Sequence, residues 1–400
     1  MIKKIQTSDL KIGMYIKELD CSWMDHPFMA GSFSLKNEKT LNKILKAGIK
    51  AASIDTSLGE DFIPEEKVEQ EIEEPVQEPI KAATNKIATT KEKISISQEE
   101  NKARAIYKEG TVIIRKMMED VRLGKQVEVE SVNPLAEKVV QSIFRNPHAL
   151  TGISRIKTKD EYTFMHCVSV TGLMVMFARN QGLSEEEIHD VAIGSLVHDV
   201  GKIMVPDKVL NKPGKLSVDE FTIMKDHVTY SREILQDNPG ISQTALDVAV
   251  LHHERMDGSG YPLGLAGDEI SLVGQMSAIV DVYDALTSVR VYKDAWEPTQ
   301  ALKKMIEWSP GHFSRELVMQ FIQCLGIYPV GSLVEMESGR VGTVLEQNED
   351  MLRPKLRIIY NAKKKCYVKV VDVDLVKEKN DKIVSAISPK EYNIDLSKFL

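Results

Sequence analysis

The chain has 400 residues, of which 42% are hydrophobic and 28% charged, so it is long enough to bury cores for two or three domains. Its formal net charge of −7 argues against a protein that coats DNA or RNA, because such proteins need basic surfaces to displace counterions from phosphates. The four cysteines are far apart and form no C-x-x-C pair, which indicates neither a disulfide framework nor a zinc ribbon.

The beginning of the chain carries no apolar block of signal-peptide length, and no run of about 18 uncharged apolar residues occurs. We therefore expect a cytoplasmic protein without a membrane span. Residues 1–58 are predicted to form a small α+β domain, because residues 14–19 alternate like a strand and residues 38–46 have helical spacing. Residues 59–100 are first acidic and then rich in lysine and threonine, which is typical of a solvated linker.

Residues 101–328 are predicted to form an all-helical domain. Their apolar spacing is mainly helical, and two capping boxes, Ser184 to Glu187 and Ser217 to Glu220, mark helix starts. After residue 328 the pattern changes to alternation, so residues 329–400 are predicted to form a short β-rich appendage. The predicted fold class is mainly α, with a small domain at each end.

Seven side chains of metal-binding type fall at the ends or on the inner faces of successive predicted helices: His166, His198, Asp199, His227, His252, His253 and Asp281. Imidazoles and carboxylates suit iron, manganese or zinc, and an aspartate can bridge two ions. Any one of these histidines alone would more simply be an ordinary core or surface residue. Their adjacency and order favour a metal centre.

The surroundings of the first ligands support this interpretation. His198 comes near the end of a predicted helix, where the helix dipole favours a cation, and Gly201 is expected to let the chain turn away. His227 is expected on the core-facing stripe of the next helix, together with Phe221 and Met224. An unpaired buried imidazole at that place would need a partner.

The run His252-His253-Glu254 leads into a glycine-rich loop that ends at Pro262. Glycines in such a loop could approach a phosphate or a base closely, although an ordinary turn is the simpler interpretation of this loop alone. On the following predicted helix, Asp281 and Asp284 share a face. Asp281 is the expected ligand, and Asp284 has the expected role of orienting its neighbours.

Together these residues resemble the HD-GYP family, a branch of the HD metal-dependent phosphohydrolases. The match runs from about Asp160 to Trp296 and includes LVHDVGKIMVPDKVLNKPGKL, MKDH, LHHERMDGSGYPLGL and VDVYDALTSVRVYKDAW. The resemblance implies an all-helical catalytic core and hydrolysis of cyclic di-GMP to linear pGpG, in some members onward to GMP. It also implies a hydroxide activated by two divalent ions, with iron or manganese preferred and zinc, nickel or magnesium as alternatives.

The resemblance further assigns roles to single residues. One ion would be bound by His166, His198, Asp199 and Asp281, and Asp199 would bridge to a second ion held by His227, His252 and His253. Asp199 and Lys202 are the implied catalytic residues, with Lys202 at the scissile phosphate. The implied substrate-binding residues are Lys202, Arg290, Lys293, Gly260, Tyr261 and Pro262.

Two positions depart from the family pattern. Tyr162 replaces a glutamate that supports a third metal in some members, so we expect two ions, and Val291 replaces the usual proline after Arg290. Segments of the N-terminal region, including residues 9–15 and 19–23, resemble a small domain of unassigned function that often precedes HD-GYP domains.

Two alternatives stay open. The chain could be a phosphohydrolase for another cyclic dinucleotide or a nucleotide, which a substrate panel would separate. It could also be a non-catalytic cyclic di-GMP sensor or adaptor that contacts partners such as diguanylate cyclases, although the complete ligand set argues against this. No DNA or RNA polymer is expected as a partner, and a homodimer is a candidate assembly.

Overall fold

The computed structural model describes residues 94–153, 162–288, 295–309 and 311–394, and in the N-terminal part residues 2–7, 10, 12–19, 32–36, 40–42, 44, 51–56 and 58–59. The chain divides into two compact units, residues 1–83 and 84–400. The predicted linker residues 60–93 lie outside the described part of the chain.

The N-terminal unit contains an antiparallel sheet with strand order β1-β4-β2-β3. The strands are β1 (Ile2–Gln6), β2 (Tyr15–Leu19), β3 (Phe33–Ser34) and β4 (Ala51–Asp55). Residues 40–42 and 44 are helical, within the range predicted as a helix. A buried core that includes Met14, Ile16 and Ile54 supports this unit, which agrees with the predicted α+β class.

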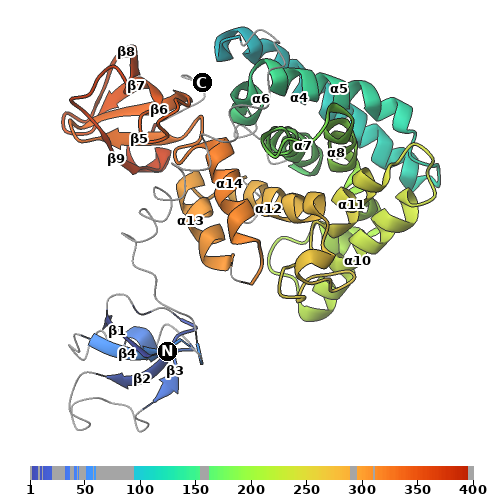
Figure 1. Cartoon of the computed structure of the whole chain (residues 1–400), viewed down its shortest axis with the longest axis horizontal. Coiled ribbons are helices and arrows are strands. Elements are labelled where there is room, and N and C mark those ends of the chain that lie inside the picture. Colours follow the sequence, from blue (N-terminus) through green and yellow to red (C-terminus); the bar gives the residue numbers. More distant parts are fainter. Residues whose placement is uncertain are drawn as a thin grey trace. The chain divides into compact units, whose positions relative to one another are not determined.

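The central part of the second unit is helical, as predicted (Figure 1). Its α-helices are α4 (Ile96–Arg122), α5 (Val129–Arg145), α6 (Pro147–Ile153), α7 (Tyr162–Asn180), α8 (Glu185–Val197), α9 (Asp207–Leu210), α10 (Val218–Leu235), α11 (Gln243–Leu251), α12 (Leu272–Thr287), α13 (Pro298–Trp308) and α14 (Arg315–Leu325). Two short 3₁₀ helices, η3 (Val200–Met204) and η4 (Gly267–Glu269), interrupt the series. Helix α4 begins before the predicted domain start at residue 101.

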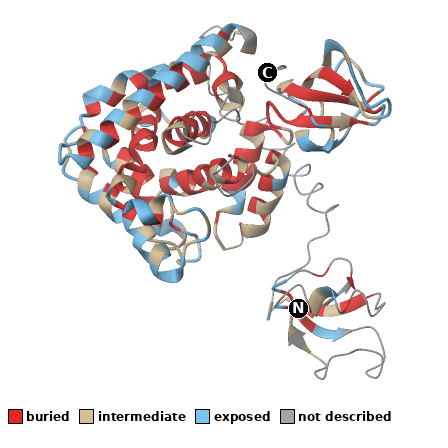
Figure 2. Cartoon of the chain, turned by 180° about the vertical axis from the view of Figure 1, so that it is seen from behind, coloured by how far each residue is buried: buried red, intermediate tan, exposed pale blue. Residues whose placement is uncertain are grey.

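Helix α7 forms the centre of this helical part and packs against α4, α5, α8 and α12. Its sequence is apolar around most of its circumference, which is the pattern of a helix that neighbours cover on all sides. Figure 2 shows that α7 and α12 are largely buried, whereas exposed residues gather on the outer helices. Both predicted capping boxes are present, at the starts of α8 and α10. None of the described helices is long and apolar enough to cross a bilayer.

The chain continues into an antiparallel five-stranded sheet with strand order β8-β7-β6-β5-β9. Its strands are β5 (Leu333–Met336), β6 (Arg340–Glu346), β7 (Lys355–Asn361), β8 (Cys366–Asp374) and β9 (Ile383–Ala386). Apolar side chains are buried on both faces of the central strands, for example Leu356 and Ile359 of β7. The predicted β-rich C-terminal appendage is thereby confirmed.

Candidate metal centre

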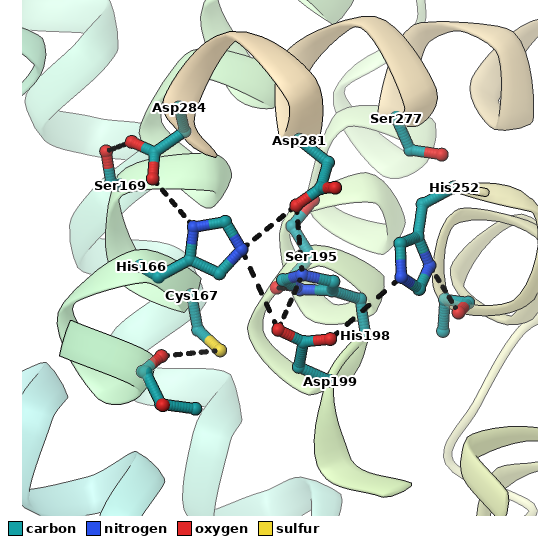
Figure 3. Close-up of polar contacts among 12 residues, drawn as sticks. His166, Cys167, Ser169, Ser195, His198, Asp199, His252, Ser277, Asp281 and Asp284 are labelled. Atoms are coloured by element: carbon teal, nitrogen blue, oxygen red, sulfur yellow. Dashed lines mark hydrogen bonds and ion pairs between the residues drawn. The ribbon is translucent and has the colours of Figure 1, made fainter. Parts of the chain in front are cut away.

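The seven predicted metal ligands come from three helices and from the connections that follow two others. His166 lies on α7, His198 ends α8, and Asp199 directly precedes η3. The others follow on α10 (His227), after α11 (His252 and His253) and on α12 (Asp281). Six of the seven are buried and His253 is half-buried. Figure 3 shows side chains of α7, α8 and α12 pointing toward one another around Asp199.

The donor atoms form two groups. In His166, His198 and Asp199 they lie within 4.8 Å of one another, and the same holds for His227, His252 and His253. Asp281 adjoins the first group, with its Oδ1 atom 3.0 Å from His166 Nε2.

Asp199 lies between the two groups and turns one carboxylate oxygen toward each. Its Oδ2 atom is 3.4 Å from His198 Nε2 and 3.7 Å from His166 Nε2. Its Oδ1 atom is 3.5 Å from His227 Nε2 and 3.9 Å from His252 Nε2. This is the arrangement required of a carboxylate that bridges two cations.

Three of the histidines are oriented by the same local hydrogen bond. The Nδ1 atoms of His198, His227 and His252 lie 2.8, 2.6 and 2.9 Å from the backbone carbonyl oxygen three residues earlier. A carbonyl can only accept, so Nδ1 carries the proton and the Nε2 lone pair is available.

These Nε2 atoms and Asp199 Oδ1 are buried and have no hydrogen-bond partner within the described part of the chain. Burying four unpaired acceptors is costly, and divalent cations bound by the two groups would satisfy them. The residues present therefore fit a bound metal.

His166 is oriented by polar side chains behind its ring. Its Nδ1 atom lies 2.6 Å from Asp284 Oδ2, and the other oxygen of Asp284 accepts a hydrogen bond from the Ser169 hydroxyl. Ser288 Oγ lies 3.3 Å from Asp284 Oδ2. Asp284 thus has the orienting position expected from its place on α12.

Burial keeps the second group of histidines neutral. It lowers the pKa of His227 to about 4 and that of His253 to about 3, and it lowers the pKa of His252 well below its usual value. Neutral imidazole is the form that binds metals, so these side chains need no deprotonation near neutral pH.

The pKa values of the two carboxylates shift in the direction that favours their ionised form. Burial raises the pKa of Asp199, but His198 and Lys202 outweigh that effect and hold it well below its usual range. Burial likewise opposes ionisation of Asp281, and its hydrogen bond with His166 lowers the pKa well below the usual range. Both carboxylates are therefore anionic ligand candidates.

Two sequence interpretations need correction. Gly201 is not among the glycines with positive φ, and a Cβ atom there would lie 2.0 Å from the carbonyl oxygen of His227. Gly201 is needed because η3 packs directly on the α10 backbone, not because the chain turns there. Phe221 does not share the core-facing stripe with His227, since 47% of Phe221 is exposed.

The loop after α11 is organised by Glu254, whose role the sequence interpretation missed. This buried carboxylate lies 2.7, 3.2 and 3.1 Å from the backbone nitrogens of Leu263, Gly264 and Leu265, which donate to it. A Cβ atom on Gly260 would lie 2.4 Å from the Arg255 nitrogen, so Gly260 permits a close approach within the loop itself. The sequence offers one signal for this role, a glutamate that directly follows the pair His252-His253.

Comparison with known proteins decides the family. A cyclic di-GMP phosphodiesterase of Pseudomonas aeruginosa is 36% identical over 396 residues, covering 98% of this chain and 94% of that protein. This chain belongs to the HD-GYP family. A family model described as an HD domain matches residues 136–317 of this HD-GYP protein. Models described as a domain of unknown function and as a KOW domain associated with HD domain match residues 2–132 and 333–395.

Two further relatives match a smaller share of this chain. A 3′3′-cGAMP-specific phosphodiesterase of Vibrio cholerae is 40% identical over 41% of this chain and 31% of that protein. The cyclic di-GMP phosphodiesterase response regulator RpfG of Xanthomonas campestris is 39% identical over 43% of this chain and 44% of that protein. HD-domain phosphohydrolases are metal-dependent, and this HD-GYP chain has a His/Asp cluster that could hold metal.

Of the remaining predicted site residues, some lie beside the metal centre and others lie outside the described residues. Lys202 lies on η3 with its ammonium 2.5 Å from Asp199 Oδ2 and 23% of its side chain exposed. Tyr261 stacks on His253 with ring centroids 4.7 Å apart, and Pro262 follows it in the loop. Arg290, Val291 and Lys293 lie outside the described residues, as does the side chain of Tyr162.

Proposed function

We propose that this protein hydrolyses cyclic di-GMP to linear pGpG at a dinuclear metal centre. The observation that carries the proposal is the placement of Asp199, whose two oxygens face two separate groups of histidines. The full-length relative named as a cyclic di-GMP phosphodiesterase supports the choice of substrate.

Two divalent ions, iron or manganese in the first instance, would be held by the two groups. His166, His198, Asp199 and Asp281 would bind one ion, and Asp199, His227, His252 and His253 the other. Bound ions would supply a Lewis acid and a hydroxide nucleophile at neutral pH. Further hydrolysis of pGpG to GMP is a second possible outcome of the same chemistry.

The protein groups around the centre would bind and orient the substrate. Lys202 is partly exposed and lies on the bridging carboxylate, so its ammonium can neutralise negative charge on a phosphate brought to the centre. Arg290 and Lys293 would hold the dianionic ring. These basic side chains would allow a protein with a net charge of −7 to bind an anionic substrate.

A second candidate substrate is 3′3′-cGAMP, because a phosphodiesterase named for it is 40% identical over 164 residues of this chain. It shares the cyclic phosphodiester backbone and differs in one base. Parallel assays with both dinucleotides distinguish the candidates.

The experiment that tests the proposal is the double substitution His198→Ala and Asp199→Ala. We expect a folded protein that loses bound metal and no longer produces pGpG, measured by metal analysis and chromatography of the products. His189→Ala on the same helix is the matched control, because His189 belongs to neither ligand group. Undiminished hydrolysis by the double variant after metal stripping and reloading would refute the proposal.

A further inference from the structure

An aromatic side chain is exposed on the helix that carries His227. Phe221 lies near the start of α10 and is 47% exposed, although phenylalanine is among the residues most often buried. Its ring is 6.5 Å from the ring of Tyr261, in an edge-to-face arrangement at 84°. The two rings thus bring α10 and the loop after α11 together at the surface.

Lys225, one helical turn after Phe221, lies over both rings. Its Nζ atom is 5.3 Å from the centroid of Phe221 and 5.5 Å from that of Tyr261. Cations at such distances are attracted to the ring faces. Within the described part of the chain, no carboxylate or carbonyl oxygen pairs with this ammonium, so its hydrogen-bond donors are available to a ligand.

This group of three residues adjoins the part of the metal centre that reaches solvent. His253 is the half-buried member of the seven candidate ligands, and it is the one on which Tyr261 stacks at 4.7 Å. A substrate whose phosphate lies at the centre would therefore extend past His253 toward Tyr261 and Phe221.

We propose that Phe221, Tyr261 and Lys225 form a subsite for a purine base of the substrate, with guanine preferred. The inference rests on the proposed hydrolysis of a cyclic dinucleotide. The exposed ring of Phe221 offers an aromatic surface on which a base can stack. Lysine donates hydrogen bonds only, which matches the O6 and N7 acceptors of guanine and not the 6-amino group of adenine.

The steady-state kinetics of Phe221→Ala test the stacking. We expect the KM for cyclic di-GMP to rise by about ten- to a hundredfold with little change in kcat, because stacking on one aromatic residue contributes about that much to binding. The kcat for bis(p-nitrophenyl) phosphate, a diester without a nucleobase, should be unchanged, because Phe221 does not touch the metal centre. Ile223→Ala, which alters another exposed apolar residue of α10, is the matched control and should leave both substrates unaffected.

Lys225→Met tests base selection. The substitution keeps an unbranched side chain next to the rings and removes the donor, so we expect the preference for cyclic di-GMP over cyclic di-AMP to fall by about tenfold. Lys208→Met on α9 removes an exposed lysine elsewhere and should not change the preference. Metal content and melting temperature should stay at the wild-type values in all four variants.

The outcomes separate the subsite from the proposed function. If the wild type hydrolyses cyclic di-GMP and Phe221→Ala leaves its KM unchanged, the subsite is wrong and the function stands. If the wild type hydrolyses only the small diester, the proposed function is wrong. Calorimetric binding of GMP then tests the subsite, which equal affinities of the wild type and Phe221→Ala would refute.

Discussion

Replacing Asp284 by asparagine tests how strongly a carboxylate outside the ligand set holds the metal centre together. Asp284 Oδ2 lies 2.6 Å from His166 Nδ1, and its other oxygen is bound by the Ser169 hydroxyl. Asparagine has nearly the same volume, so no cavity is created and the main loss is the negative charge. Hydrogen bonds to charged groups contribute about 1.5–3 kcal/mol.

The expected consequence of Asp284→Asn is weaker metal binding. Partners behind a metal-binding histidine typically contribute about ten- to a hundredfold in metal affinity, which agrees with the energy of one such bond. Competition with a chelator of known affinity measures the change directly. Ser288→Ala is the matched control, because Ser288 Oγ is 3.3 Å from the same carboxylate oxygen and should contribute less.

The pH dependence of metal binding gives a second readout of Asp284→Asn. Burial lowers the pKa of His166, but its hydrogen bonds with Asp281 and Asp284 outweigh burial and leave that pKa raised. A metal must displace this proton, so the apparent affinity falls as the pH drops below the pKa of His166. Removing the charge of Asp284 lowers this pKa and moves the decline to lower pH. Unchanged affinity together with an unchanged pH profile would refute the orienting role.

Three further predictions concern other parts of the chain. Lys202→Ala should lower kcat for cyclic di-GMP while metal analysis shows retained metal, whereas loss of metal would indicate a structural role. Glu254→Gln replaces a carboxylate that accepts from three backbone N–H groups by an amide with one carbonyl oxygen. The melting temperature of this variant should fall and its KM for cyclic di-GMP should rise. An unchanged melting temperature would contradict the role of Glu254 as an anchor of the loop. Burial raises the pKa of Glu99, but its hydrogen bonds with Arg145 outweigh burial and lower the pKa from 4.5. The pair therefore stabilises the fold above that pH, and this stabilisation is lost as the pH falls through the pKa of Glu99. Arg145→Met should reduce the free energy of unfolding more at neutral pH than in acid, and a pH-independent difference would contradict the pairing.

The features that could be predicted from sequence are those that depend on neighbouring residues. Ser184 and Ser217 mark helix starts because each capping box is complete within four residues. His198 was expected near a helix end for the same kind of reason, and it ends α8. At the start of β7, Leu356 and Ile358 are buried while Lys355 and Arg357 are partly exposed, because alternation is a local property of a strand with two environments.

The features that the sequence did not reveal depend on contacts between distant segments. Gly201 looks like a turn glycine in the sequence, but its restriction comes from the backbone of α10, 26 or more positions later in the chain. Phe221 has the spacing of a core residue, yet 47% of it is exposed beside Tyr261 of the loop after α11. Glu254 gains its function from backbone groups of the loop that folds back on it. Periodicity within one helix cannot report such contacts.

The metal centre combines both kinds of information. For His198, His227 and His252, the Nδ1 hydrogen bond to the carbonyl three residues earlier fixes the direction of Nε2 within each helix, so orientation is local. The meeting of these Nε2 atoms around Asp199 instead requires α8, α10 and α11 to be packed at the correct separation. A substitution that shifts a helix without touching a ligand, such as a side chain at Gly201, should therefore disturb metal binding as a unit.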